Sequence, residues 1–526
     1  MMKNPHRADR PAPQLFLFVT AAICGALVMV IEVLGSRVVG PFYGVNLFVW
    51  TSLIAVTLVS LAVGYALGGV FADRRGGVGN LYGIILAAGV AVLLLPVLKA
   101  PVLMACQPLG LRMGALVSST ILFGPSLVLL GCVSPFIVKL ATRDLGRLGR
   151  TVGAFYAVST VGSFLGTVAT GFLLIAWLRI SRIFWLVGIT LILLALVYFL
   201  FYRRRWAALA FVVLLALPSP VREPVRVVRA SGTVATEMHR KEGFYGVIQV
   251  VDYAGGDMHT RELMIDGFIQ GGIDMKDGLS IYPYTYVAQY LSRALLPHGE
   301  RGLVVGLGAG IMPLWFEKQG VAIDVVDIDP HVVQAAEDWF GLSVSGEIYI
   351  EDARYFLRRT SQRYDYILLD VFSGESTPGH VLSLEAFRLA HERMTPDGVL
   401  TVNLVGCVGE GQVVVPSVVR TLEQVFDQVR THPLDHPDFS DGCANIILLA
   451  HDGPERVPDL SVVADQPIHP LAARAEPALT RSYRLPPGAG AFVITDDFNP
   501  IDLLDLPFRE RLRRATLADL DWEFLL

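Results

Sequence analysis

Hydrophobic positions are unevenly distributed along the chain, and the pattern changes near residue 220. Before that point, long stretches carry no charged side chain, and most reach the roughly 20 residues that a helix needs to cross a bilayer core. Six or seven such runs are too many for a signal peptide, so residues 1–221 are predicted to form a multi-span α-helical membrane domain. The runs are Leu15–Ile31, Val38–Ala72, Gly76–Leu98, Met113–Val138, Thr151–Leu178, Ile183–Tyr202 and a shorter one, Trp206–Val221.

Two pairs of glycines lie one helical turn apart within these apolar runs, Gly64 with Gly68 and Gly162 with Gly166. Small residues at this spacing let the backbones of neighbouring membrane helices approach closely. We therefore expect both pairs to lie at helix–helix contacts rather than to line a pore.

From about Thr233 the pattern changes to short strands. Two alternating runs around the turn-prone Ala254–Asp257 predict a β-hairpin, and Gly278–Leu295 reads as a helix. Strands and helices then alternate, which predicts a mainly parallel, doubly wound α/β sheet of the Rossmann-like kind. The predicted domains are a linker and hairpin subdomain over 222–290 and a Rossmann-like domain over 291–526. The predicted hairpin strands are Phe244–Asp252 and Glu262–Gln270; the later strands are Gly302–Gly306, Ala322–Asp327, Ile348–Ile350, Tyr364–Asp370 and Val399–Leu404, with others near Val429 and Asn445–Leu449.

A glycine-rich turn follows the first strand of this sheet. It carries Gly306, Gly308 and Gly310, leads into a helix, and is followed by a strand that ends on Asp327. Glycines let the backbone approach a nucleotide closely, and an acid closing the second strand can accept both ribose hydroxyls of an adenosine. The order of strand, turn, helix, strand and acid predicts a nucleotide or S-adenosyl site at the carboxyl ends of the strands.

Five sequence segments together resemble the spermidine synthases (polyamine aminopropyltransferases), and most closely their membrane-fused branch, the facilitator–spermidine synthase fusions. The segments are ELMIDGFIQ, VVGLGAG, VVDIDP, IEDARYF and YDYILLDVFSGESTPGHVLS, and the later TDDFNP at Thr495–Pro500 is similar as well. The resemblance implies a fold shared with S-adenosylmethionine methyltransferases. It also implies decarboxylated S-adenosylmethionine as the co-substrate and no metal.

The resemblance also implies roles for individual residues. Asp370 matches the aspartate that accepts a proton from the attacking amine, and Tyr282 matches the active-site tyrosine. An ammonium group cannot attack carbon before it loses a proton, so a carboxylate at a strand end suits this role. The expected donor-site residues are Gln270, Gly306, Gly308, Gly310, Asp327, Asp352, Ala353 and Pro378, and the expected acceptor-site residues are Ser373 and Glu375.

The chain departs from the family pattern mainly where the family holds its amine. Ala309 stands where an aspartate is usual in the glycine turn, Ser373 replaces a second aspartate, and Pro283-Tyr284 follow the tyrosine. A buried diammonium needs paired carboxylates to offset its desolvation. Three functions therefore stay open: aminopropyl transfer to an amine such as putrescine, methyl transfer from S-adenosylmethionine to another acceptor, and a non-catalytic nucleoside sensor that regulates the membrane half.

Structural roles are alternatives for some of these acids. Asp370 and Asp352 each precede a segment where a helix could begin, so each could cap that helix. Asp329 precedes Pro330 at a predicted helix start, where capping is the favoured role.

Composition adds few further constraints. The five cysteines form no CxxC or metal-ligand spacing, so we expect neither a disulfide nor a zinc site. The net charge of -5 comes without a basic stripe, which argues against nucleic acid as a partner. The expected partners are a small-molecule amine acceptor and the lipid bilayer, with a homodimer left open.

Basic residues predict the orientation of the membrane domain. They cluster before the first run, after the second, between the fourth and fifth, and after the sixth, which places the N-terminus in the cytoplasm. Six spans would leave the soluble domain in the cytoplasm, and seven would export it. Because an adenosine co-substrate is made in the cytoplasm, we expect a multi-pass protein of the cell membrane with a cytoplasmic soluble domain.

Overall fold

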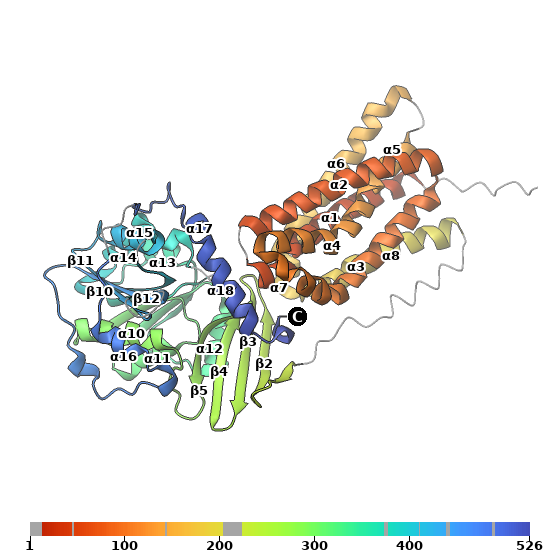
Figure 1. Ribbon diagram of the computed structural model, residues 1–526. Coiled ribbons are helices and arrows are strands. Elements are labelled where there is room, and N and C mark those ends of the chain that lie inside the picture. The colour runs from red at the N-terminus through yellow and green to blue at the C-terminus, as the bar shows by residue number, and fades with distance from the viewer. Residues whose placement is uncertain are drawn as a thin grey trace, which may run out of the picture. The chain divides into compact units, whose positions relative to one another are not determined.

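The structure is a computed structural model, and it describes residues 13–44, 47–142, 145–203, 224–372, 377–409, 411–437, 442–485 and 490–525. The chain divides into two compact units, Met1–Glu223 and Pro224–Leu525. Figure 1 shows that the described part of the first unit is built from helices and that the second unit combines sheets with helices.

The first unit contains six long helices among its described residues. Five helical segments are long and apolar enough to cross a membrane, and one of them, Val78–Ala141, contains two of the long helices, α3 and α4, which pack against each other. The six predicted spans therefore match six helices, whereas Trp206–Val221 lies outside the described residues. The helices are α1 (Gln14–Tyr43), α2 (Leu47–Arg75), α3 (Val78–Cys106), α4 (Gly110–Gly131), α6 (Leu148–Ala169) and α8 (Ile180–Val197), with shorter α5 (Val133–Ala141) and α7 (Ile175–Trp177).

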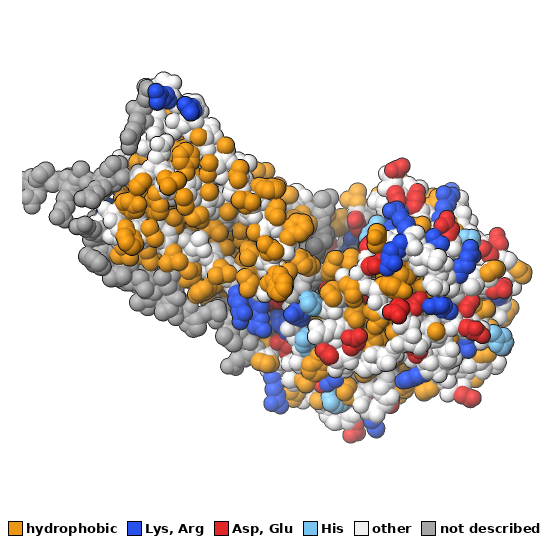
Figure 2. All heavy atoms as spheres, turned by 180° about the vertical axis from the view of Figure 1, so that it is seen from behind, with side chains coloured by type: hydrophobic (Ala, Val, Ile, Leu, Met, Phe, Trp, Pro, Cys, Tyr) orange, Lys and Arg blue, Asp and Glu red, His pale blue; other side chains and the backbone are white. Residues whose placement is uncertain are grey.

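Both glycine pairs lie at close helix contacts, as predicted. A Cβ atom on Gly162 or Gly166 of α6 would collide with backbone atoms of α1, and one on Gly64 of α2 would collide with the backbone of α4. Gly68 meets Cys132, just beyond the end of α4, in the same way. Many large apolar side chains of this unit are exposed, and they gather on the face that Figure 2 shows, as a bilayer environment favours.

The second unit begins with a five-stranded antiparallel sheet in the order β1-β2-β3-β4-β5. The predicted turn at Ala254–Asp257 joins β3 to β4. However, the predicted second hairpin strand is wrong, because Asp266 and Gly267 adopt left-handed conformations with φ of 50° and 79° and divide it into β4 and β5. An Asp-Gly pair at a tight turn is a strong hairpin signal. The strands are β1 (Arg226–Val228), β2 (Val234–Glu242), β3 (Val247–Gly255), β4 (Met258–Ile265) and β5 (Phe268–Asp274).

A seven-stranded sheet follows, in the order β11-β12-β10-β9-β6-β7-β8. Five of its strands are parallel, and β12 and β11 complete one edge in antiparallel pairing. The prediction of a mainly parallel, doubly wound sheet is therefore confirmed. The strands are β6 (Arg301–Val305), β7 (Ala322–Asp327), β8 (Ile348–Ile350), β9 (Tyr364–Leu369), β10 (Met394–Cys407), β11 (Gln428–Pro433) and β12 (Cys443–His451).

Helices cover both faces of this sheet (Figure 1). Successive residues of β6 point to opposite faces, so Val304 belongs to one core with α10–α12, while Leu303 and Val305 belong to the other with α13–α15. The helices are α10 (Pro283–Leu295), α11 (Ile311–Lys318), α12 (Pro330–Phe340), α13 (Ala353–Arg359), α14 (Leu384–Glu392), α15 (Val414–Leu422), α16 (Ala475–Thr480), α17 (Ile501–Leu504) and α18 (Leu506–Asp519).

One expectation about the cysteines is wrong. Cys407 and Cys443 form a disulfide, with 4.1 Å between their Cα atoms, while Cys24, Cys106 and Cys132 are free and buried. The two partners are far apart in sequence and have no motif spacing. They meet because β10 and β12 pair in a register that places them directly opposite each other.

Candidate active site

The glycine turn lies at the carboxyl edge of the sheet in a conformation that other residues rarely adopt. Gly306, Gly308 and Gly310 have φ angles of 87°, 53° and 72°. A Cβ atom on Gly308 would lie 2.7 Å from the carbonyl oxygen of Gln270, and one on Gly306 would collide with the backbone carbonyl of Asp370. These glycines therefore allow β5 and the end of β9 to approach the turn.

Asp327, at the end of β7, organises this turn through its carboxylate. One oxygen accepts a hydrogen bond from the Leu307 amide at 2.8 Å, and the other accepts one from the Asp329 amide, also at 2.8 Å. Burial raises the pKa of Asp327 to about 6, although both amides favour its charged form. The carboxylate is therefore fixed beside the glycine turn, where a ribose acceptor was predicted.

Asp352 has the geometry of a helix cap. Its side chain accepts a hydrogen bond from the Tyr355 amide at 3.0 Å at the N-terminus of α13, and its other oxygen lies 3.5 Å from Nε2 of His380. Ala353 is the first residue of that helix and is partly buried. Asp329 caps α12 in the same way, as predicted. Capping by one oxygen leaves the second oxygen of Asp352 directed towards the loop after β9.

Asp370 follows β9, next to the glycine turn. One carboxylate oxygen accepts a hydrogen bond from the side-chain amide of Asn403 at 2.7 Å, and Asn403 accepts one from Asn445 at 3.1 Å. Burial raises the pKa of Asp370 to about 6, and the Asn403 hydrogen bond opposes this rise. A carboxyl group with such a pKa is ionised near neutral pH yet basic enough to take a proton.

The structure separates the roles of two tyrosines. Tyr282 hydrogen-bonds Glu262 of β4, and burial raises the pKa of that glutamate to about 7. Burial and the charge of Asp370 raise the pKa of Tyr284 well above its usual value, and its hydroxyl donates to the carbonyl of Gln270 at 3.4 Å. Of these two tyrosines, Tyr284 is therefore the one whose pKa depends on the charge of Asp370.

The loop after β9 is held by the TDDFNP segment. Asn499 donates to the carbonyl of Gly379 at 2.8 Å, and Asp496 forms a two-pronged ion pair with Arg354 at 2.7 Å. Arg354 in turn donates to the carbonyl of His380. Pro378 precedes the short helical turn Gly379–Val381 in this loop, and its carbonyl accepts a hydrogen bond from the Val381 amide. The predicted acceptor-site residues Ser373 and Glu375 lie outside the described residues.

Gln270 and Tyr245 complete the described surroundings. The side chain of Gln270 donates to the carbonyl of Phe268 at 3.3 Å, within its own strand. Tyr245, which is half exposed, had no predicted role. Burial and the charges of Asp329, Asp352 and Asp327 raise its pKa, so it lies near these three carboxylates. Its position just before β3 carried no motif signal.

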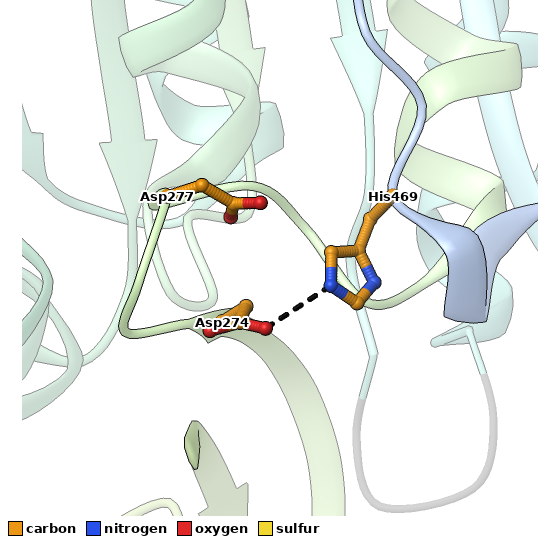
Figure 3. A group of neighbouring side chains, drawn as sticks. All are labelled: Asp274, Asp277 and His469. Atoms are coloured by element: carbon orange, nitrogen blue, oxygen red, sulfur yellow. Dashed lines mark hydrogen bonds and ion pairs between the residues drawn. The ribbon is translucent and has the colours of Figure 1, made fainter. Parts of the chain in front are cut away.

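Asp274, Asp277 and His469 come close enough together to suggest a metal site (Figure 3). However, Nδ1 of His469 accepts a hydrogen bond from the Leu471 amide, and its Nε2 lies 3.1 Å from Asp274. This pattern assigns the ring proton to Nε2, which leaves no free lone pair for a metal. Each aspartate also accepts a hydrogen bond from a backbone amide two residues later. Through the contact between Asp274 and His469, the group connects β5 to the segment around His469.

The sheet order, the glycine turn and the strand-end acids define a Rossmann-like domain with a nucleoside-type site. More specifically, residues 269–456 match the family model described as "Spermine/spermidine synthase domain", so the C-terminal region carries a domain of this family.

The similar proteins include polyamine aminopropyltransferases and methyltransferases. The polyamine aminopropyltransferase of Vibrio vulnificus is 36% identical over 131 residues, covering 23% of this chain and 43% of that protein. The N-terminal histidine N-methyltransferase of Emericella nidulans is 32% identical over 152 residues, covering 27% of each chain. This chain thus spans less than half the length of these two curated relatives. Both names describe transferases.

Among solved structures, a probable spermidine synthase from Corynebacterium glutamicum is 22% identical, with a TM-score of 0.36. The match covers 41% of this chain and 81% of that one.

Proposed function

We propose that the second unit is a transferase that moves an alkyl group from an S-adenosyl donor to an amine. In its most specific form, the activity is aminopropyl transfer from decarboxylated S-adenosylmethionine to an acceptor such as putrescine. The observation that carries this proposal is the position of Asp370: it lies against Gly306 of the turn and is held by Asn403. A proton acceptor thus lies beside the predicted nucleoside site.

The proposed reaction is an in-line displacement at carbon. The acceptor amine approaches Asp370 and gives up a proton to its carboxylate, either before or during attack. The nitrogen lone pair then forms the new bond to the propyl carbon adjacent to the sulfonium. The carbon–sulfur bond breaks with its electron pair going to sulfur, and neutral methylthioadenosine leaves. Asp370 passes its proton to water. Pre-positioning the two reactants contributes to the rate together with this proton transfer.

Methyl transfer from S-adenosylmethionine is a second candidate, and a specific observation favours it. Ala309 is buried in the glycine turn at the position where the family usually carries an acid. That acid would repel the carboxylate of S-adenosylmethionine, which the decarboxylated donor lacks. A methyltransferase is also among the similar proteins. In this case the leaving nucleoside would be S-adenosylhomocysteine.

The compartment of the soluble unit is part of the proposal. We propose that the helices of the first unit tether it to the cytoplasmic face of the cell membrane, where S-adenosyl donors are made. The Cys407–Cys443 disulfide argues for the opposite side of the membrane, because disulfides persist mainly in oxidising compartments outside the cytoplasm. Protease protection of the soluble unit in sealed membrane vesicles of known orientation would decide its side.

The product formed tests the function. The full-length protein, purified in detergent, is incubated with each donor and with amines and lipids, and the products are identified by mass spectrometry. Methylthioadenosine that forms only with the decarboxylated donor plus an amine supports aminopropyl transfer. S-adenosylhomocysteine would replace this proposal with the methyltransferase. Nucleoside binding without either product would instead indicate a sensor.

A further inference from the structure

The disulfide lies at the same edge of the sheet as the candidate active site. Cys407 and Cys443 occupy the last paired positions at one end of the β10–β12 ladder, the end nearest the carboxyl terminus of β10. Beyond them, the Val408 amide donates to the carbonyl of Gly442 at 3.0 Å. The covalent bond therefore holds together the ends of two strands whose inner residues contact the site.

Two asparagines connect this strand end to Asp370. Asn445 lies two positions after Cys443 on β12, and its side-chain amide donates to the carbonyl oxygen of the Asn403 side chain at 3.1 Å. Asn403, which is only 2% exposed, then donates to Asp370 at 2.7 Å. An amide group can present either its oxygen or its nitrogen, and the bond from Asn445 selects the orientation that presents nitrogen to Asp370.

A cation lies beside the two sulfur atoms. Nη2 of Arg511, in α18, is 3.7 Å from Sγ of Cys407 and 3.9 Å from Sγ of Cys443. A neighbouring guanidinium stabilises a thiolate relative to a thiol, and the thiolate is the form that attacks disulfides. Cys443 is only half buried, so a small reductant has access to this pair. The surroundings thus favour exchange between the bonded and the reduced state.

We propose that Asn445 and Asn403 are positioning residues for Asp370, and that the Cys407–Cys443 disulfide maintains their alignment, so that the thiol redox state controls the site. The proposal rests on the transferase function above. The reductant is a dithiol: one of its thiolates attacks a protein sulfur, and its second thiol then resolves the mixed disulfide. Two electrons and two protons pass to the protein, which gains two thiols, and the dithiol becomes a disulfide.

The effect on the site follows from the hydrogen bonds. Without the covalent bond, the ends of β10 and β12 can separate, and Asn445 no longer fixes the amide of Asn403. Asn403 can then turn its oxygen towards Asp370, where two oxygens repel. Because the Asn403 hydrogen bond lowers the pKa of Asp370, its loss raises that pKa further. The reduced protein should therefore need a higher pH for activity.

Two substitutions of Asn445 test the hydrogen-bond relay from Asn445 through Asn403 to Asp370 in the full-length protein. Asn445→Ala removes the donor, whereas Asn445→Asp replaces it with an acceptor that forces Asn403 to reverse its amide. The acid limb of the kcat–pH profile should move to higher pH in both variants, and further in Asn445→Asp, while the donor KM changes less than twofold. If the acid limb of the kcat–pH profile is the same in both variants as in the wild type, the proposed role of Asn445 is wrong.

Cysteine variants test the redox step, with a matched control in the same chain. Dithiothreitol should lower kcat several-fold below pH 7 in the wild type. The double variant Cys407→Ser/Cys443→Ser should have the kcat of the reduced wild type, and dithiothreitol should not change it. The triple variant Cys24→Ser/Cys106→Ser/Cys132→Ser should respond like the wild type. Equal activity of fully reduced and oxidised wild type, with the redox state verified by alkylation and mass spectrometry, would overturn the control by redox state.

Failure of this inference is distinguishable from failure of the function. If the wild type turns over no donor, the transferase proposal fails, but hydrogen–deuterium exchange still reports on the strand ends. Reduction should then increase exchange at residues 403–408 and 443–447 more than at β6, and unchanged exchange would overturn the inference. If turnover is present and indifferent to reduction, only the inference fails.

Discussion

The donor side and the acceptor side of the candidate site are built from different kinds of contact. On the donor side, the carboxylates of Asp327 and Asp352 each accept hydrogen bonds from backbone amides close to the glycine turn or to a helix start. On the acceptor side, Asp370 is held by the side chain of Asn403, which is held in turn by Asn445. The first arrangement depends on local chain conformation, and the second on strand pairing.

This difference has a chemical consequence. Backbone amides remain hydrogen-bond donors when their own side chains are substituted. The amide contacts to Asp327 and Asp352 should therefore survive substitutions at the residues that supply them. A relay of side chains can be altered one residue at a time, because Asn403 and Asn445 each supply one hydrogen bond of it. We expect donor recognition and acceptor chemistry to be separable by mutation.

The largest difference between the effect on turnover and the effect on nucleoside binding should come from Asp370→Asn. The amide keeps the size of the side chain but cannot accept the amine proton, so kcat should fall by about 10²- to 10⁴-fold. The dissociation constant of the nucleoside product should stay within about twofold of the wild-type value, as judged by calorimetric titration. Turnover that survives this change would contradict the role of Asp370 as proton acceptor.

The opposite separation is expected from Asp327→Ala. Loss of a charged acceptor near the ribose should weaken donor binding by about 10- to 100-fold, in line with the 1.5–3 kcal/mol typical of hydrogen bonds to charged groups. Once donor is saturating, kcat should change much less. Asp329→Asn is the matched control, because asparagine still caps α12. Equal loss of affinity in both variants would mean that the effect is not specific to Asp327.

The pH dependence of turnover should follow the acceptor side. Because the pKa of Asp370 is about 6, its carboxylate is protonated below that pH, and kcat should fall about tenfold per unit towards pH 5. Stability should change in the opposite sense. Burial makes the charged forms of Asp370 and Asp327 unfavourable, so their contribution to the free energy of unfolding is largest at low pH. It decreases as pH rises between about 4 and 6. A flat rate profile across this range would contradict the assignment.

The smallest effect concerns the glycine turn, and a second glycine provides its control. Gly308 and Gly320 both have positive φ, of 53° and 77°, but only Gly308 has a neighbour that an added Cβ would meet. Gly320→Ala should therefore cost about 1 kcal/mol of backbone strain. Gly308→Ala should cost more and should also weaken donor binding. Equal melting temperatures for the two variants would show that the approach of Gln270 to the turn is unimportant.

Local patterns predicted much of this molecule correctly. Six of the seven apolar runs correspond to long helices, and the alternation of strands and helices corresponds to the doubly wound sheet. These features depend on residues close together in sequence, where the period of apolar positions is sufficient information. The prediction of the second hairpin strand was wrong for a local reason, because the Asp266-Gly267 turn was included in that strand.

The incorrect and missing assignments involve contacts between distant parts of the chain. Cys407 and Cys443 became partners only through strand register, and no spacing rule could pair them. Asn403 and Asn445 gave no signal, because an asparagine in a strand gains its role from what lies across the sheet. Tyr284 gave no signal either, because the charge of Asp370 reaches it only in the folded domain.

The sequence by itself determined that this protein has an apolar multi-helix half and a nucleoside-binding type of α/β half, with a glycine turn and acids at the ends of strands. Those properties follow from periodicity and from residues that act on their own backbone. Only the tertiary structure decided that Asp370 is held by Asn403, that Tyr282 pairs with Glu262, and that a disulfide closes the β10–β12 edge. The reason is physical: side-chain partners separated by tens of residues are selected by sheet order and register, which no single segment contains.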